Sequence, residues 1–259
     1  LRAHCRDGVE VIDAGFGQDG LPMTRAGRAK LVAGAARRGG RIVRLVDGDP
    51  ATFSGLADEI SACRKADVPF EIVPGVSIET AVPTYAGVPL TPAGISGVHV
   101  VRPHAQQHVD WAAHAGAGTT VVEVGDTDDI VHAARSLAEH GMDGETSVAI
   151  TSQGTTVAQR TLSLSLAAVP GALPAAGLTG ELTAVVGAGV DLRDVASWYE
   201  TKPLFGWRVL VPRTKEQAGT TVSRLEEHGA VASVVPTISV EPPRTPQQIE
   251  KAVKGLVTG

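Results

Sequence analysis

Short apolar runs rich in β-branched residues recur along the chain and predict β-strands. Polar residues flank each run and few interrupt it, which is typical of strands buried on both faces. The runs are RIVRLV at 41, FEIV at 70, VHVV at 98, TTVVEV at 119, SVAIT at 147, TAVVG at 183, RVLVP at 208 and VASVV at 231. Helical segments separate several of them, and this alternation predicts an α/β fold with largely parallel strand pairing in its first part.

Two helices are predicted between these strands. In residues 55–66, GLADEISACRKA, one face of the helix carries Leu56, Ile60 and Cys63, so Cys63 is interpreted as a core residue. In residues 127–141, TDDIVHAARSLAEHG, Thr127 is the expected N-cap and Gly141 the expected end. The expected buried stripe of this second helix consists of Ile130, Ala134 and Leu137.

A change in composition near residues 198–207, WYETKPLFGW, marks a predicted domain boundary. Before it, residues 163–182 are rich in Ala, Gly and Pro and are interpreted as a loop region around short extended pieces. After it, a strand, helix and strand are expected. Their signals are a capping box of Thr214 and Gln217, a left-handed cap at Gly229 and a further helix that opens at Thr245.

Composition narrows the possible partners. The 259 residues are 43% hydrophobic and 20% charged with a formal net charge of -5, and no basic run is interleaved with aromatics, so nucleic acid is not an expected partner. No apolar run reaches the roughly 18 residues that a membrane span needs. Two cysteines, Cys5 and Cys63, favour a reducing cytoplasm over a disulfide framework. The start, LRAHCRDG, has no initiator methionine, and the chain is expected to be a fragment.

Two polar stretches follow predicted strands. Asp47, Gly48, Asp49 and Pro50 follow the strand at 41, where an open α/β sheet binds ligands; the alternative is a tight turn whose aspartates bond nearby backbone groups. In residues 71–92, EIVPGVSIETAVPTYAGVPLTP, Ser77 either caps a short helix or offers its hydroxyl to a ligand. Pro83 is expected to interrupt or bend that helix.

A metal site is not predicted. His104 and His108 have the i, i+4 spacing that two ligands on a helix share, but no third ligand is near in sequence, so a solvated face is the favoured interpretation.

The order of these motifs resembles the tetrapyrrole methylase family, and within it the uroporphyrinogen-III C-methyltransferases. The resemblance is carried by DGDPATF after a strand, PFEIVPGVS after a helix, and AVPTYAGVPLT. The linker and tail, from LRDVASWYETKPLFGWRVLVPRTKEQAG to GAVASVVPTISVEPP, are similar to the start of uroporphyrinogen-III synthase. The resemblance implies a methylase domain at 1–200, with lobes at about 1–90 and 91–200, and the beginning of a synthase domain at 201–259.

In that family S-adenosylmethionine lies in a cleft between two α/β lobes, held largely by loop backbone. The resemblance implies C-methylation of uroporphyrinogen III to precorrin-2, a tetrapyrrole partner and a homodimer. It assigns no catalytic residue. The implied cofactor-binding residues are Asp47, Gly48, Asp49, Thr52, Ser77, Ile78, Val124 and Gly154.

Departures from the family pattern leave an alternative. The family usually has glycine where this chain has Asp47, and a lysine-containing pattern is missing before the first helix. The resemblance also implies that the amino-terminal glycine-rich strand and loop of the methylase lobe are missing from this chain. The alternative is a catalytically degenerate methylase-like domain that binds or scaffolds the synthase. A methylase of the same fold acting on RNA or another substrate is disfavoured by the acidic balance and by the synthase-like tail.

Overall fold

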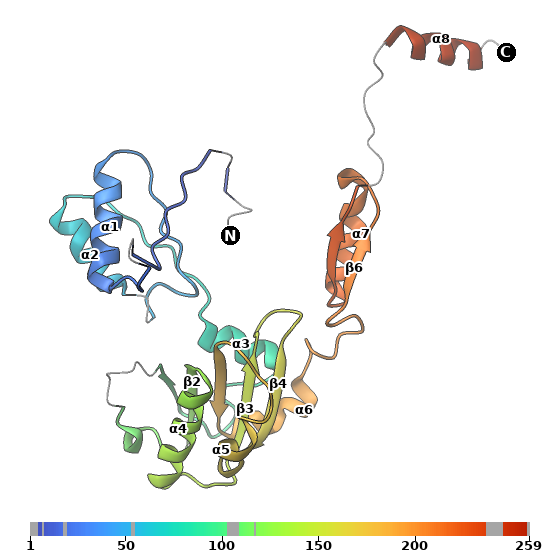
Figure 1. Ribbon diagram of the computed structural model, residues 1–259. Coiled ribbons are helices and arrows are strands. Elements are labelled where there is room, and N and C mark those ends of the chain that lie inside the picture. Colours follow the sequence, from blue (N-terminus) through green and yellow to red (C-terminus); the bar gives the residue numbers. More distant parts are fainter. Residues whose placement is uncertain are drawn as a thin grey trace.

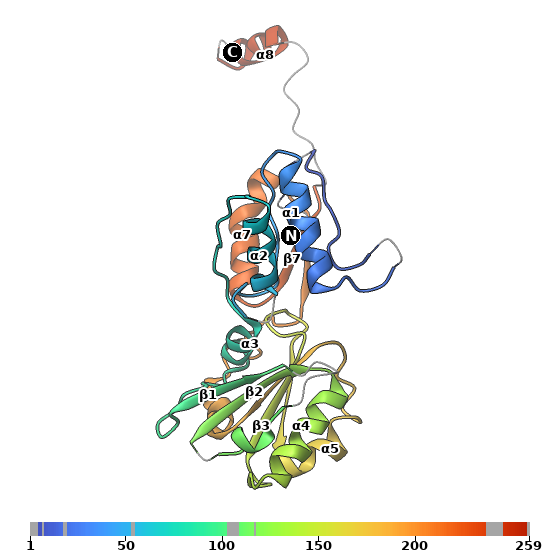
Figure 2. The same ribbon diagram turned by 90° about the vertical axis from the view of Figure 1, so that its left-hand side faces the viewer.

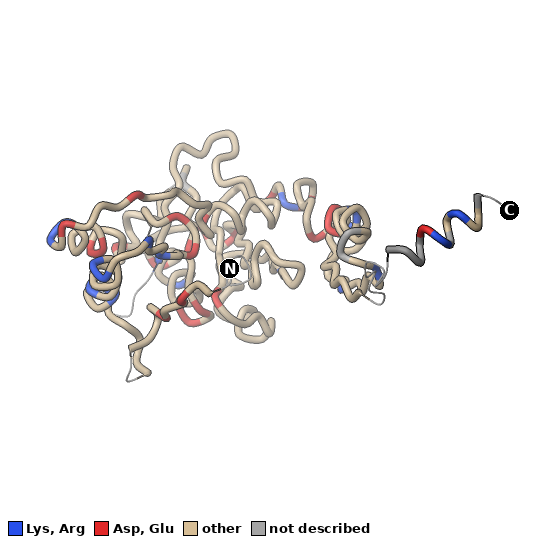
Figure 3. Tube along the Cα trace, turned by 90° about the horizontal axis from the view of Figure 1, so that it is seen from above, with Lys and Arg blue, Asp and Glu red and all other residues tan. Residues whose placement is uncertain are grey.

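The computed structural model describes residues 5–6, 8–17, 20–52, 55–102, 109–116, 118–236 and 246–257. Figure 1 shows an amino-terminal helical region, a central sheet with its helices, a small carboxy-terminal unit and a final helix that stands apart. Acidic and basic residues are interspersed along the described trace (Figure 3).

The central sheet has five strands in the described part of the chain, in the order β1-β2-β5-β3-β4. Only β1 and β2 are parallel; β5 is antiparallel to β2 and β3, and β3 is antiparallel to β4. The predicted parallel pairing in the first part of the chain is confirmed for β1 and β2, whereas the later strands pair antiparallel. A short turn joins β3 to β4, and such a connection requires antiparallel pairing. The strands are β1 (Gly97–Val101), β2 (Thr119–Gly125), β3 (Ser147–Ser152), β4 (Arg160–Ser165) and β5 (Leu182–Val186).

Helices cover both faces of this sheet. Figure 2 shows α4 and α5 along one face, where α4, η2, η3 and α5 enclose the larger apolar core. On the other face α3 contacts β2 and β5, and a smaller cluster includes Ala86, Val122 and Val185. The elements are α3 (Ile78–Ala86), η2 (Trp111–Ala113), α4 (Thr127–Glu139), η3 (Leu166–Ala168), α5 (Val169–Ala172), η4 (Ala188–Leu192) and α6 (Arg193–Ala196).

Helix α4 confirms its predicted buried stripe but begins differently from the prediction. The N-cap is Asp126 rather than Thr127. The Asp126 carboxylate accepts from the backbone N–H of Asp129 at 3.0 Å, and the Asp129 carboxylate accepts from the backbone N–H of Asp126 at 3.0 Å. This reciprocal pair satisfies two free donors of the first turn, which a threonine one residue later does not do. Helix α3, for its part, is not interrupted by Pro83 but continues to Ala86.

The amino-terminal region contains α1 (Arg25–Arg37) and α2 (Leu56–Lys65), which pack against each other. Cys63 is 6% exposed, as its place on the α2 stripe predicts. The strands predicted at 41–46 and 70–73 are wrong for the described structure, in which neither segment belongs to a strand. A strand needs a neighbour for its backbone hydrogen bonds, and the described central sheet is built wholly from residues 97–186. Val43 and Val73 are accordingly exposed.

The carboxy-terminal unit consists of β6 (Arg208–Val211), α7 (Lys215–Glu227) and β7 (Val231–Val234), with β6 and β7 parallel. Gly229 has the predicted left-handed backbone, with φ +91°. Thr214 is the N-cap of α7 but its side chain makes no capping bond, so the predicted capping box is absent. Helix α8 (Pro246–Val257) follows, while Thr245 and residues 237–243 lie outside the described residues.

No described helix has the length and apolar character needed to cross a membrane. Nor does the described part of the chain bring three His, Cys, Asp or Glu side chains together in a way that suits a metal ion. His104 and His108 lie outside the described residues.

Candidate functional site

Two loops far apart in sequence meet beside the amino-terminal end of α3. The first contains Gly48, whose φ of +74° suits glycine, and a Cβ there would lie 3.3 Å from Ser77 Cα in the second loop. A Cβ on Gly75 would overlap the carbonyl oxygen of Gly48. Glycine at both positions therefore allows the two backbones to touch.

Side chains of the first loop join it to the second. Asp49 Oδ1 accepts from Ala51 N at 2.7 Å, and Asp49 Oδ2 accepts from Gly75 N at 3.3 Å. The hydroxyl oxygens of Thr52 and Ser77 lie 3.0 Å apart. Asp49 thus does what the tight-turn alternative predicts, and it also ties the loops together.

Ser77 occupies the N-cap position of α3 without using its side chain as a cap. The Ser77 side chain therefore accepts from neither the backbone N–H of Ile78 nor that of Glu79. These donors, at the positive end of a helix, suit an anionic or strongly polar ligand group.

A third segment, the turn after β3, packs on α3 from the other side. Gln153 and Thr155 have φ of +51° and +65°, which non-glycine residues rarely adopt. Between them, a Cβ on Gly154 would overlap the side chain of Val82 on α3. The turn is therefore both strained and closely packed, as is common where a chain forms a binding site.

These three segments and the ends of β3 and β5 line a cavity of about 490 Å³ that is open to solvent on one side. Its walls combine an apolar side from α3 with a polar side from the turn and the strand ends. The lining residues are Asp47, Gly48, Val76, Ile78, Ala81, Val82, Thr151, Gln153, Gly154, Thr155, Thr156, Glu181 and Thr183.

The structure separates the predicted site residues into three groups. Asp47, Gly48, Ile78 and Gly154 line the cavity. Asp49, Thr52 and Ser77 brace the loops behind it. Val124 is 1% exposed within β2, where it pairs with the lining residue Thr183 and does not itself line the cavity.

Sequence reasoning missed much of the polar wall. The run TSQGTT at 151–156 comes at the end of the buried strand β3, and this polar run could have identified Gln153, Thr155 and Thr156 beside Gly154, which the sequence had already indicated. Glu181 and Thr183 carry no comparable local signal, since they enter the site only because β5 lies between β2 and β3.

Two carboxylates near the end of β2 differ in environment. At the cavity, Glu181 pairs with Arg102, with 2.6 Å between Oε2 and Nη2. Glu123 is 2% exposed, and its Oε1 has no hydrogen-bond partner among the described residues. Burial, and then the nearby Asp129 carboxylate, raise the pKa of Glu123 to about 9, so it is protonated at neutral pH.

Comparison with known proteins shows relatives in tetrapyrrole biosynthesis. The chain is 31% identical over 244 residues to the porphyrin biosynthesis protein HemD of Ruminiclostridium josui, covering 90% of this chain and 47% of that protein. It is 30% identical over 207 residues to siroheme synthase of Methylobacillus flagellatus, covering 78% of this chain and 44% of that protein. The chain therefore spans about half the length of the curated relatives it matches.

A solved structure shares the fold. Uroporphyrin-III C-methyl transferase from Thermus thermophilus, complexed with S-adenyl homocysteine, matches with a TM-score of 0.54 and 23% identity, over 63% of this chain and 70% of that one. The profile of the tetrapyrrole (corrin/porphyrin) methylases matches residues 1–170. With two loops, a strained turn and strand ends gathered around one cavity, and with this match over most of its length, the chain belongs to the tetrapyrrole methylase family.

Proposed function

We propose that this chain carries the site of an S-adenosylmethionine-dependent C-methyltransferase that converts uroporphyrinogen III to precorrin-2. The observation that carries the proposal is the convergence of the 47–49 loop, the start of α3 and the 153–156 turn on one cavity. Membership of the methylase family and the bound S-adenyl homocysteine of the Thermus thermophilus relative support it.

The lining residues fit the chemistry of this cofactor. S-adenosylmethionine has an anionic carboxylate, polar ribose and adenine edges, and apolar carbon between them. The N–H groups at the start of α3, which the Ser77 side chain does not cap, suit the carboxylate, and the hydroxyls of Thr151, Thr156 and Thr183 suit the polar edges. Ile78, Ala81 and Val82 offer apolar contact to the rest. When bound, the cofactor supplies a methyl group made electrophilic by its sulfonium sulfur.

The residues of the chain would act mainly by positioning. A neutral pyrrole carbon is a modest nucleophile, and holding it in line with a methyl group recovers the entropy that an encounter in solution loses. The braced loops provide a rigid frame for this purpose, because Asp49 and Thr52 hold them from behind rather than from within the cavity.

We further propose that residues 1–200 form the methylase domain and that 201–259 begin a uroporphyrinogen-III synthase domain. The match to HemD extends over 90% of the chain, beyond the 170 residues that the methylase profile covers. The β6, α7 and β7 unit supports a separate domain. On this proposal the protein acts in the cytoplasm, as a homodimer, in the pathway to sirohaem, cobalamin or haem.

Calorimetric titration of S-adenosylhomocysteine into the full-length protein tests the methylase proposal. We expect binding by the wild type, and loss of binding in a variant that combines Asp49→Ala with Gly154→Trp, which removes the loop tie and fills the cavity. Asp58→Ala, on the exposed surface of α2, is the matched control for the aspartate and should bind as the wild type does. No binding by a folded wild type would refute the enzyme proposal and favour the scaffold alternative.

A further inference from the structure

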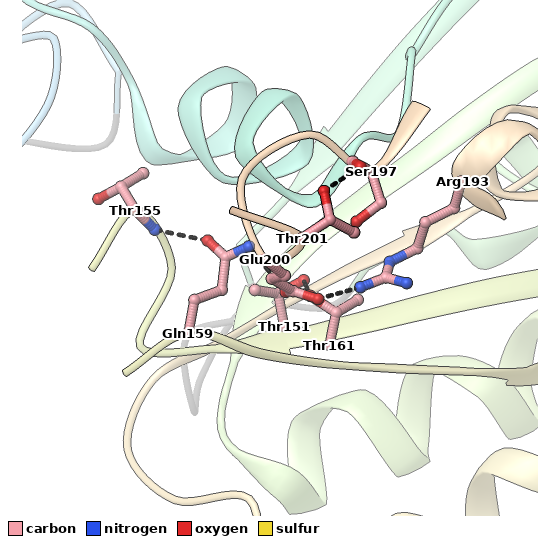
Figure 4. A network of polar contacts seen from close by, with 8 residues as sticks. All are labelled: Thr151, Thr155, Gln159, Thr161, Arg193, Ser197, Glu200 and Thr201. Carbon is pink, nitrogen blue, oxygen red and sulfur yellow. Dashed lines mark hydrogen bonds and ion pairs between the residues drawn. The ribbon is translucent and has the colours of Figure 1, made fainter. Parts of the chain in front are cut away.

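A partly buried network of polar contacts joins the segment after α6 to the sheet (Figure 4). Glu200 is its centre. Glu200 Oε1 accepts from Gln159 Nε2 at 2.8 Å and from Thr161 Oγ1 at 2.6 Å, while Oε2 pairs with Arg193 Nη2. The carboxylate thus accepts hydrogen bonds from an amide and a hydroxyl and pairs with a guanidinium.

Gln159 connects this network to the cavity. Gln159 is only 2% exposed, and its Oε1 accepts from the backbone N–H of Thr155 at 2.8 Å. Thr155 lines the cavity and has the strained φ of +65°. The carboxamide of Gln159 therefore holds the turn in a backbone conformation that threonine disfavours on its own.

The orientation of that carboxamide depends on Glu200. A glutamine amide has one accepting and one donating end, and only one orientation serves Thr155. An ionised carboxylate accepts and never donates, so Glu200 draws the NH₂ end of Gln159 toward itself and leaves the oxygen for the turn. Removing the charge removes this preference.

The segment that carries Glu200 is itself fixed against the opposite wall of the cavity. Trp198 Nε1 donates to the carbonyl oxygen of Thr84 on α3 at 2.9 Å. A Cβ on Gly87 would lie 2.6 Å from the backbone of Ala196, so the backbones of these two segments touch directly. Tyr199 and Tyr85 also stack edge to face, with ring centroids 4.6 Å apart.

We propose that Glu200 is a positioning residue for the cofactor cavity. Its carboxylate sets the orientation of Gln159, and Gln159 in turn holds Gln153–Thr156 in the shape that lines the cavity. The identity of the ligand rests on the proposed function, whereas the link from Glu200 to Thr155 does not. The segment after the sheet is then part of the binding machinery as well as a connection between domains.

Exchanging the two side chains tests this link. In Gln159→Glu the carboxylates at 159 and 200 face each other, and in Glu200→Gln the new amide cannot accept fully from both Gln159 and Arg193. In the double variant the amide at 200 donates to the carboxylate at 159 and accepts from Arg193. Thr161 can then donate to Thr151, whose Oγ1 lies 3.1 Å away, so Thr161 keeps an acceptor and the net charge is unchanged.

Two measurements report on the exchange. Titration with S-adenosylhomocysteine should show affinity reduced by about tenfold or more in each single variant and restored to within about threefold in the double variant. Hydrogen exchange at the amide of Thr155, measured without ligand, should accelerate in the single variants and slow again in the double variant. Glu139→Gln, an exposed site at the end of α4 with the same charge change, is the control and should alter neither reading.

The outcomes separate the inference from the proposed function. The inference alone is overturned if the wild type binds the ligand and both single variants keep its affinity and its rate of exchange at Thr155. It is also overturned if the losses of affinity in the single variants simply add in the double variant. Absence of wild-type binding refutes the proposed function, and Thr155 exchange then decides the inference. If the single variants do not fold, Glu200→Asp keeps the charge but withdraws it from Gln159, and should accelerate Thr155 exchange; unchanged exchange would overturn the inference.

Discussion

Gly154 is where one added methyl group tests the contact between the cavity turn and α3. A Cβ there would overlap Cγ2 of Val82 and lie 2.7 Å from Cγ1 and 3.1 Å from Cβ. The φ of Gly154 is outside the left-handed region, so the expected penalty is steric rather than conformational. Val82 is 5% exposed on α3, and its side chain has little room to move away.

The magnitude follows from packing energetics. Forcing an extra methyl group into a filled core costs about 1–3 kcal/mol, and each kcal/mol lowers the melting temperature of a domain of this size by about 2–4 °C. Val82→Ala removes both Cγ atoms and costs about 1.6 kcal/mol in lost apolar burial, at about 0.8 kcal/mol for each group. In the double variant the new Cβ has space, so a favourable coupling free energy of about 1–3 kcal/mol is expected.

Denaturant unfolding of the wild type, Gly154→Ala, Val82→Ala and the double variant measures this coupling. Gly219→Ala is the control, because a Cβ at this helical position in α7 meets nothing within 4 Å. It should leave stability unchanged or raise it slightly, as expected for glycine replaced by alanine in a helix. Equal stability of Gly154→Ala and the wild type, or strictly additive losses in the double variant, would refute the steric reasoning.

Three further predictions concern single positions. The pKa of Glu123 is raised from 4.5 to about 9, so between these pH values the folded state binds one proton more than the unfolded state. The free energy of unfolding should therefore fall by up to about 1.4 kcal/mol per pH unit as the pH rises from 4.5 to 9. Glu123→Gln should remove this slope in urea titrations, and an identical slope would contradict the assignment. Asp126→Ala should cost about 0.5–2 kcal/mol through loss of the α4 capping box, measured by urea unfolding; no loss of stability would show that the cap contributes nothing. Gly75→Ala places a Cβ on the carbonyl oxygen of Gly48 and should weaken S-adenosylhomocysteine binding at least about tenfold by calorimetry, whereas wild-type affinity would show that the two loops separate at no cost.

Local sequence patterns determined the elements that depend on local physics. Helix α4 follows from its apolar stripe, since residues three and four apart share a helix face. The strands β2, β3 and β5 follow from β-branched runs that are typical of strands buried on both faces. The loop at Asp47–Asp49 and the polar position of Ser77 were also recognisable. Glycine, aspartate and serine favour turns and helix starts because of their own backbone freedom and their hydrogen bonds to neighbouring residues.

Tertiary structure decided what depends on a partner. The apolar segments 41–46 and 70–73 read as strands, yet a strand exists only where another backbone accepts its hydrogen bonds, and the described sheet offers none beside them. β5 reaches the cavity because it lies between β2 and β3, which brings Thr183 beside Thr151. Glu200 is linked to the cavity by its hydrogen bond to Gln159, which lies 41 residues earlier in the sequence. The composition of a binding wall therefore lies beyond local pattern, because it is set by which distant segments the packed core brings together.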